Sequence, residues 1–207
     1  MENLTVIMKV TKRDYVTFLK EEVIHMSGVV QPIRSKRDID KMKKALAGKP
    51  RDLLLFIFGI NSALRISDIL KLKVGDVRGK ESISLKETKT RKSKRFHLND
   101  SIKKAVVELI PPTADDNDWL FPSRKGDKAI SRIQAYRILN TAADRAGLNI
   151  EIGTHTLRKT FAFHAYKNGT DLALLQTILN HSSQRETLVY LCIEQKQIDD
   201  VYIEINL

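Results

Sequence analysis

Residues 82–98 read SISLKETKTRKSKRFHL and break the helical pattern that runs through most of the chain. Apolar and polar residues alternate from Ser82 to Lys86, and alternation returns from Lys94 to Leu98. Alternation on both sides of a polar, basic turn is typical of a β-hairpin, because successive side chains of a strand point to opposite faces. We therefore predict one small antiparallel sheet at this point of the chain.

Apolar residues recur at helical spacing on both sides of this hairpin. The predicted helices are Thr11 to His25, Ser35 (as N-cap) to Ala47, Arg51 to Ala63, Ser67 to Lys71, Ser101 to Leu109, Ile130 to Ala146, Thr154 to Lys167, Asp171 to Asn180, and a last one from Glu186 onward. The sequence lacks the Gly-rich motifs of nucleotide-binding folds, which argues against a Rossmann fold. The predicted fold class is mixed, mainly α with a small antiparallel β-sheet.

The net charge of the chain is +11, from 36 Lys and Arg against 25 Asp and Glu. Such an excess favours a polyanionic partner, DNA or RNA first of all. An anionic membrane surface is the competing interpretation, but no basic amphipathic helix with aromatic anchors supports it. Basic residues concentrate from Lys86 to Arg95, whereas the stretch from Glu194 to Leu207 is net acidic. The hairpin is therefore the predicted anion-binding region, and the tail is not.

Composition also sets expectations about compartment and cofactors. No run of about 18 apolar residues is present, so no transmembrane helix is predicted. A single cysteine, Cys192, cannot form an internal disulfide, and residues 1–10 do not resemble a signal peptide, so a cytoplasmic location is expected. The histidines show no zinc-ligand spacing, and we expect neither a metal nor a nucleotide cofactor.

Three residues stand out as potential phosphate ligands, although each also has a structural interpretation. Arg65 lies among apolar residues at a helix junction and needs an anionic partner, either Asp68 in an ion pair or a phosphate. His155 and Arg158 are three residues apart, which places them on one helix face. There they can bind phosphate oxygens together, or remain surface and capping residues.

Three further residues are weaker candidates for the site when each is considered alone. Lys89 lies at the hairpin turn and could be a solvated charge in a basic run. His181 follows a helix end, where a histidine is usually a cap or a satisfied core residue. Tyr190 lies within the apolar run Leu188 to Leu191, where a tyrosine is ordinarily core and not a nucleophile.

In this order, Arg65, Lys89, His155-x-x-Arg158, His181 and Tyr190 resemble the signature of the tyrosine recombinase (phage integrase) catalytic domain. The local sequences are similar to the family as well, namely ALRISDILKLKVGDV, ETKTRKSKRFHL, THTLRKTFA and LLQTILNHSSQRETLVYL. The resemblance extends from Pro32 to the early 190s. It implies the tyrosine recombinase fold and site-specific recombination, such as integration, excision or inversion of a phage or mobile element.

The resemblance also implies a role for each of the six residues. Tyr190 is the expected nucleophile, which attacks a DNA phosphate and forms a 3′-phosphotyrosyl link. The two Arg would clamp the developing charge, and such donors are each worth on the order of 3 kcal/mol of barrier. The two His would donate hydrogen bonds or move a proton. Lys89 is the candidate general acid for the leaving 5′-hydroxyl, and the stored bond energy makes ATP unnecessary.

The implied partner is double-stranded DNA, bound by a homotetramer, with a monomer expected in its absence. The hairpin cations expected to bind DNA are Lys86, Arg91, Lys92, Lys94 and Arg95. We expect residues 1–31 to be a short extension and residues 32–207 to be the catalytic domain, whose tail begins near residue 195. In relatives such a tail docks on a neighbouring protomer, whereas a tail that packs on its own domain is the plainer alternative.

Two departures from the family pattern lie beside predicted catalytic residues. Lys159 follows Arg158 where many relatives have another His, and Asn180 precedes His181 where Gly is frequent. Neither change removes a proposed catalytic group. Two other functions remain open: a non-catalytic DNA-binding regulator with a recombinase fold, and an enzyme with type IB topoisomerase-like activity.

Overall fold

The predicted hairpin forms as an antiparallel pair of strands, β1 (Ser82–Lys86) and β2 (Ser93–His97). Ser82 pairs with His97 and Leu85 with Lys94. Ile83 is buried and Leu85 is partly buried against the core, so one face of the hairpin covers the helices. The prediction of a small antiparallel sheet is confirmed, and the structure adds a register that the sequence alone did not specify.

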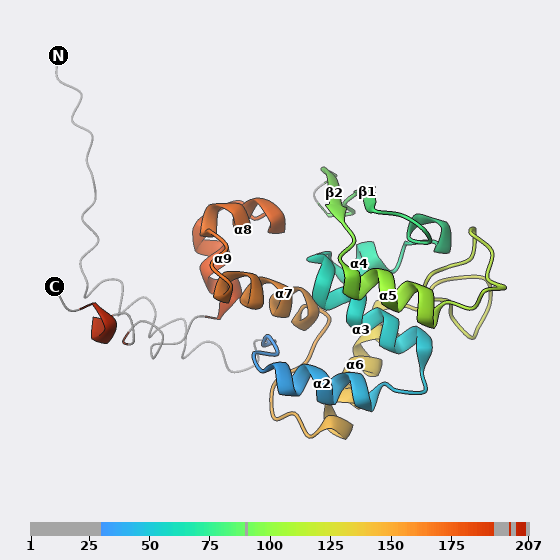
Figure 1. Cartoon of the computed structure of the whole chain (residues 1–207), viewed down its shortest axis with the longest axis horizontal. Coiled ribbons are helices and arrows are strands. Elements are labelled where there is room, and N and C mark those ends of the chain that lie inside the picture. The colour runs from blue at the N-terminus through green and yellow to red at the C-terminus, as the bar shows by residue number, and fades with distance from the viewer. Residues whose placement is uncertain (1–29, 90, 193–198, 200–201, 206–207) are drawn as a thin grey trace, which may run out of the picture. The chain divides into compact units, whose positions relative to one another are not determined.

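The structure is a computed structural model that describes residues 30–89, 91–192, 199 and 202–205. Residues 30–192 form one compact unit, shown in Figure 1 from α2 to α9. The helix predicted from Thr11 to His25 lies outside the described residues. So does most of the predicted tail from residue 195 onward.

Helices make up about half of this unit. Their bounds are α2 (Lys36–Ala45), α3 (Pro50–Ser62), α4 (Ile66–Ile69), the 3-10 helix η1 (Val74–Asp76), α5 (Asp100–Leu109), α6 (Arg132–Ala146), α7 (Thr156–Lys167), α8 (Leu172–Leu179) and α9 (Gln184–Leu191). The predicted α-helices of this unit are present, with ends that agree to within about two residues. The 3-10 helix was not predicted.

The core forms around the apolar helix α3. Leu54, Leu55, Phe56 and Phe58 are fully buried, and α3 packs on both α5 and α7. Gly59 allows α7 to approach closely, because a Cβ at this position would lie 2.4 Å from Leu157 Cδ1. The approach matters for the site, since α7 follows His155 and carries Arg158.

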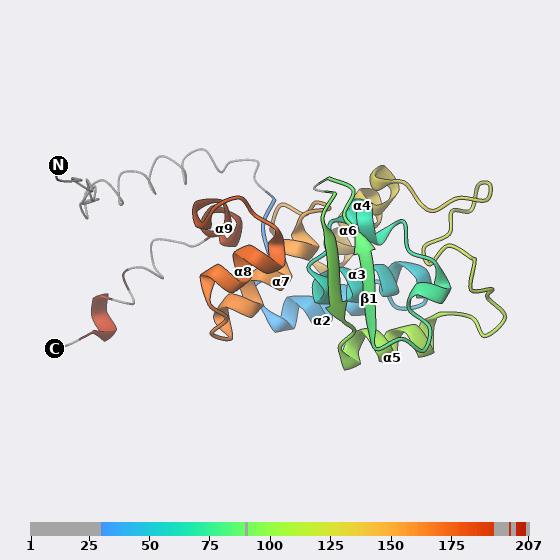
Figure 2. The ribbon, with the colours of Figure 1, turned by 90° about the horizontal axis from the view of Figure 1, so that it is seen from above.

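Two groups of elements face each other across the region where the predicted site residues lie. Figures 1 and 2 show α7, α8 and α9 together at one end of the unit, and the hairpin with α4 beside them. Helix α7 contacts both α8 and α9, and α8 contacts α9. These contacts bring His155 and Arg158, at the start of α7, close to the segments that carry His181 and Tyr190.

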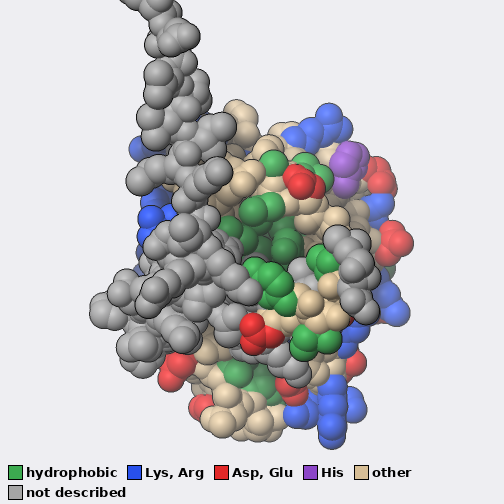
Figure 3. Space-filling model, turned by 90° about the vertical axis from the view of Figure 1, so that its left-hand side faces the viewer, with side chains coloured by type: hydrophobic (Ala, Val, Ile, Leu, Met, Phe, Trp, Pro, Cys, Tyr) green, Lys and Arg blue, Asp and Glu red, His purple; other side chains and the backbone are tan. Residues whose placement is uncertain are grey.

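The surface beside α8 and α9 is partly apolar. On the face shown in Figure 3, hydrophobic side chains gather near the centre and basic side chains lie toward the edges. Leu174 of α8 and Val189 of α9 are exposed. Within the described part of the chain, no helix has both the length and the apolar character needed to cross a membrane.

Candidate active site

Four of the six predicted site residues line one cavity of about 390 Å³. Its walls come from the start of α4, the hairpin turn, and the starts of α6 and α7. The described lining residues are Arg65, Ile66, Ser67, Thr88, Lys89, Arg132, Thr154, His155 and Arg158. They include four cationic side chains and no acid, and the N-termini of α6 and α7 add their positive dipole ends. The cavity is therefore suited to an anion.

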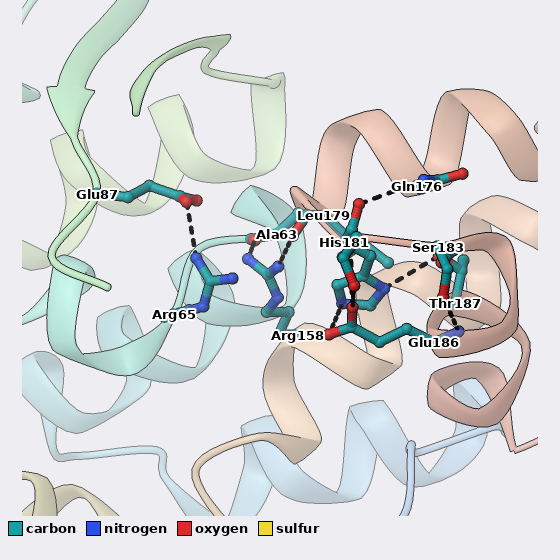
Figure 4. A network of polar contacts seen from close by, with 11 residues as sticks. Ala63, Arg65, Glu87, Arg158, Gln176, Leu179, His181, Ser183, Glu186 and Thr187 are labelled. Atoms are coloured by element: carbon teal, nitrogen blue, oxygen red, sulfur yellow. Dashed lines mark hydrogen bonds and ion pairs between the residues drawn. The ribbon is translucent and has the colours of Figure 1, made fainter. Parts of the chain in front are cut away.

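Arg158 is the most deeply held of these cations. Its side chain is buried, and Nη1 donates to the Ala63 carbonyl at 2.5 Å. The Leu179 carbonyl accepts a second hydrogen bond, from Nη2 (Figure 4). Burial lowers the pKa of Arg158 below its ordinary value. The two carbonyls belong to the C-terminal ends of α3 and α8, so Arg158 links these two helix ends beside the cavity.

Arg65 forms an ion pair with Glu87, an acid that the sequence pattern did not single out. Its Nη1 donates to Glu87 Oε2 at 2.7 Å, and the Glu87 side chain is fully buried (Figure 4). The alternative ion pair with Asp68 is not what the structure shows. Asp68 is buried beneath the hairpin turn, and its Oδ1 accepts the backbone N–H of Thr88 at 2.8 Å. Asp68 therefore fixes the turn that carries Lys89.

His181, which lies just after α8, and Tyr190 of α9 are next to each other. Their ring centroids are 4.9 Å apart, and the His155 ring lies 6.5 Å from the Tyr190 ring. His181 Nδ1 is 3.0 Å from the Thr187 hydroxyl, which fixes the orientation of its ring (Figure 4). His181 and Tyr190 thus join the four cavity residues, and the six predicted residues come from five separate segments.

The protonation of the two histidines is set mainly by burial. Burial lowers the pKa of His181 to about 4, and nearby Arg158 and Arg65 act in the same direction, although Glu186 opposes them. His155 lies at the surface, yet partial burial of its ring and the charge of Arg158 also lower its pKa. Both imidazoles are therefore neutral near pH 7 and can either donate or accept a proton.

The Tyr190 hydroxyl is fully buried, although the rest of the side chain is partly accessible. Burial raises the pKa of Tyr190 to about 12, while the neighbouring Arg158 cation lowers it. Lys159 contributes a second cation, whose Nζ lies 5.3 Å from the centre of the Tyr190 ring. Its Nζ also lies 3.3 Å from the Cys192 sulfur. The phenol is therefore neutral near pH 7.

The hairpin cations do not all face the same way. Five of them are exposed, namely Lys86, Lys89, Arg91, Lys92 and Arg95. Lys94 instead points toward α8, where its Nζ donates to the Ile178 carbonyl at 2.7 Å. Burial lowers the pKa of Lys94 to about 8, and the Arg158 cation contributes in the same direction. Among the five cations predicted to bind DNA, Lys94 is the one whose ammonium binds the C-terminal end of α8.

Sequence reasoning missed three residues of this site. Arg132 lines the cavity from the first turn of α6, Glu87 binds Arg65, and Asn180 donates a hydrogen bond to Glu87. Arg132 carried one signal, because Ser131 before it forms a capping box with Gln134 and so fixes where α6 begins. Glu87 is the single acid in the basic run, which is a weak hint that it pairs internally.

The fold and the arrangement of these six side chains define a tyrosine recombinase catalytic domain. The crystal structure of XerA recombinase superposes with a TM-score of 0.71 at 21% identity, over 86% of this chain and 66% of that one. XerH recombinase bound to its difH substrate gives a TM-score of 0.62, also at 21% identity, over 84% and 54% of the two chains.

The chain belongs to the phage integrase family, whose family model matches residues 35–197. It is 51% identical over 168 residues to the "Probable integrase/recombinase YoeC" of Bacillus subtilis, which covers 81% of this chain and 92% of that protein. It spans about half the length of the XerA, XerC and XerD recombinases that it also matches.

Proposed function

We propose that this protein carries out site-specific DNA recombination by cleaving and rejoining strands through Tyr190. The observation that carries the proposal is the convergence of Arg65, Arg158 and Lys89 on one cavity, next to the buried Tyr190 hydroxyl. A cationic cavity beside a phenol suits a phosphodiester, because the cations stabilise charge on its non-bridging oxygens. Family membership and the likeness to recombinase structures support the same function.

In the proposed cleavage step, Tyr190 Oη attacks the phosphorus and the bond to the 5′-oxygen breaks. The phenol proton passes to a neutral imidazole, for which His155 and His181 are the candidates. Lys89 gives a proton to the leaving 5′-oxygen, so a free 5′-hydroxyl and a 3′-phosphotyrosyl link result. The developing phenolate is stabilised by Arg158 and Arg65, whose cations lower the pKa of Tyr190 against the effect of burial.

Rejoining is the reverse of this step, with a 5′-hydroxyl as the attacking group. One phosphate ester is exchanged for another, so the covalent link retains the energy of the broken bond and the reaction needs no ATP. Arg132 extends the cationic wall of the cavity, and we propose that it contacts the same phosphate or its neighbour.

We further propose that the protein acts as a tetramer on double-stranded DNA, with residues 32–207 as the catalytic domain and residues 1–31 as a short extension. The DNA-bound XerH relative supports duplex DNA as the partner. Integration or excision of a phage or other mobile element is the proposed biological setting. The segment from residue 195 onward is proposed to dock on a neighbouring protomer.

A duplex nicked close to the cleavage point tests the function, because loss of the short leaving strand prevents rejoining. We expect the protein to remain covalently attached to this DNA and to join it to a second duplex that offers a 5′-hydroxyl. Binding without attachment would identify a non-catalytic DNA-binding protein. Attachment to the nicked duplex without joining to a second duplex would identify a topoisomerase.

A further inference from the structure

We propose that Glu87 and Asn180 are positioning residues for Arg65, an inference that rests on the proposed function. Glu87 Oε2 accepts two hydrogen bonds, from Arg65 Nη1 at 2.7 Å and from Asn180 Nδ2 at 2.9 Å. The donors come from different elements, since Arg65 precedes α4 and Asn180 ends α8. One buried oxygen therefore connects the hairpin, the start of α4 and the end of α8.

The two hydrogen bonds leave Arg65 with a defined orientation. A guanidinium has five N–H groups in a fixed plane, so a bond at Nη1 sets the direction of the remaining donors. The Arg65 side chain is 14% exposed and lines the cavity, whereas the Glu87 side chain is 0% exposed. The side of Arg65 that Glu87 does not occupy is thus available to a phosphate in the cavity.

Asn180 can make this contact because of its backbone conformation. It has φ 49° and ψ 43°, the left-handed region that Gly, Asn and Asp adopt at low cost. The same conformation ends α8 and aims the Asn180 side chain at Glu87. A glycine would keep this backbone but would leave Glu87 without the amide donor, so Asn180 adds an interaction that a glycine cannot supply.

Other charged groups surround Glu87 and affect any titration at this position. From the hairpin, Lys89 and Lys94 lie nearby, and Asp68 belongs to α4. Arg158 of α7 binds the Leu179 carbonyl, next to Asn180. His181 follows Asn180 directly, so the amide contact also fixes the chain segment that presents His181 to Tyr190.

The proposal is tested by the rate of covalent attachment to the nicked duplex, measured at saturating DNA. Asn180→Gly keeps the backbone conformation and is expected to slow attachment about ten-fold, with DNA affinity changed less than about two-fold. Such a split is expected because Arg65 loses its orientation while the cations that bind DNA remain. Glu87→Gln, which retains the shape of the side chain, should slow attachment in the same way.

Asn180→Asp separates positioning from a purely structural role. At neutral pH the new carboxylate faces Glu87 and cannot donate a hydrogen bond. The charge of Glu87 and burial both raise the pKa of the new group, against the opposing cations, so it becomes a donor as the pH falls. We expect the attachment rate relative to wild type to rise from about pH 8 to about pH 6 for this variant and to stay flat for Asn180→Gly.

Three results would overturn the proposal. The first is wild-type attachment rates in Asn180→Gly, and the second is a relative rate for Asn180→Asp that does not change with pH. The third is faster attachment by Glu87→Gln, which would mean that Glu87 competes with the phosphate for Arg65. If the wild type itself forms no adduct, the proposed function fails and this inference fails with it.

Discussion

At the scale of single residues, the site combines fixed cations with neutral acid–base groups. Arg158 is held by two backbone carbonyls, and Arg65 by Glu87, so neither side chain needs to reorganise much when a phosphate arrives. Preorganised donors of this kind lower the barrier because their ordering was completed during folding. The high pKa of Tyr190, about 12, keeps the phenol protonated near pH 7, so the proposed attack requires a neutral imidazole to accept the proton.

The lowered pKa of His181 predicts a loss of stability in mild acid. The unfolded chain protonates this histidine near its ordinary pKa of 6.5, whereas the folded protein does so only near pH 4. Because the unfolded state binds the extra proton first, the free energy of unfolding should fall as the pH drops from 6.5 toward 4. Urea unfolding at about pH 7 and about pH 5 measures this loss.

The matched control is His181→Gln, which cannot take up a proton. The loss between these two pH values should be smaller in the variant than in the wild type, with His155 accounting for part of what remains. An equal loss in both proteins would contradict the lowered pKa of His181 in the folded protein.

The sequence predicted six site residues from their types, order and local contexts, and the structure brings these residues together. It did not identify the residues that hold them. Glu87 was counted as one acid in a basic run, and the structure shows it buried against Arg65. Asn180 was noted only as a departure from the family, since nothing in a linear sequence shows that its side chain reaches a strand end 93 residues away.

At the scale of elements, the hairpin presents two different faces. Lys86 and Arg95 lie on the exposed face, whereas Lys94 lies on the face toward α8 and binds the Ile178 carbonyl. The sequence correctly predicted the strands, because alternation is a local property. It could not separate the five cations by role, because that depends on which helix the inner face meets.

This separation predicts different salt dependences for hairpin variants. Each phosphate neutralised contributes a slope of about −0.9 to the logarithm of DNA affinity against the logarithm of salt concentration. Replacing both Lys86 and Arg95 by Ser should therefore make the slope shallower by up to about 1.8. Lys94→Met, the matched control, should leave the slope unchanged while reducing stability, because it leaves the Ile178 carbonyl without its donor.

Filter binding over a range of salt concentrations gives these slopes. A slope that changes as much for Lys94→Met as for single replacement of Lys86 or Arg95 would mean that the Lys94 ammonium leaves α8 and binds DNA. The hairpin would then have to rearrange in the complex.

At the scale of the whole molecule, the apolar helix α3 supports the helix that carries Arg158. Helix α3 packs on α5 and α7, and its final residues lead to Ala63, whose carbonyl accepts from Arg158. The helical spacing of apolar residues predicted these elements well. The tertiary contacts between these elements could not be predicted. The close packing of Gly59 against Leu157, for example, depends on the arrangement of whole helices and not on a local sequence pattern.

Assembly is predicted to depend on the end of the chain. Tyr202, Ile203 and Ile205 are exposed apolar residues in a segment whose sequence is net acidic, which disfavours binding to DNA. Deleting residues 195–207 should therefore abolish the tetramer on paired DNA sites and reduce strand exchange, while a single duplex is still bound. Sedimentation of the complexes measures this. An unchanged tetramer with normal strand exchange would show that the segment has only a local role.

The central claim is that Tyr190 forms the covalent bond to DNA. The most direct measurement is mass spectrometry of the peptide that remains linked to the nicked duplex after proteolysis, with Tyr190→Phe as the control. We expect a linked peptide that contains Tyr190 joined to a 3′-phosphate. The Tyr190→Phe variant should form no adduct but should still bind the duplex. An adduct that persists in Tyr190→Phe, or a link through a 5′-phosphate, would contradict the central claim.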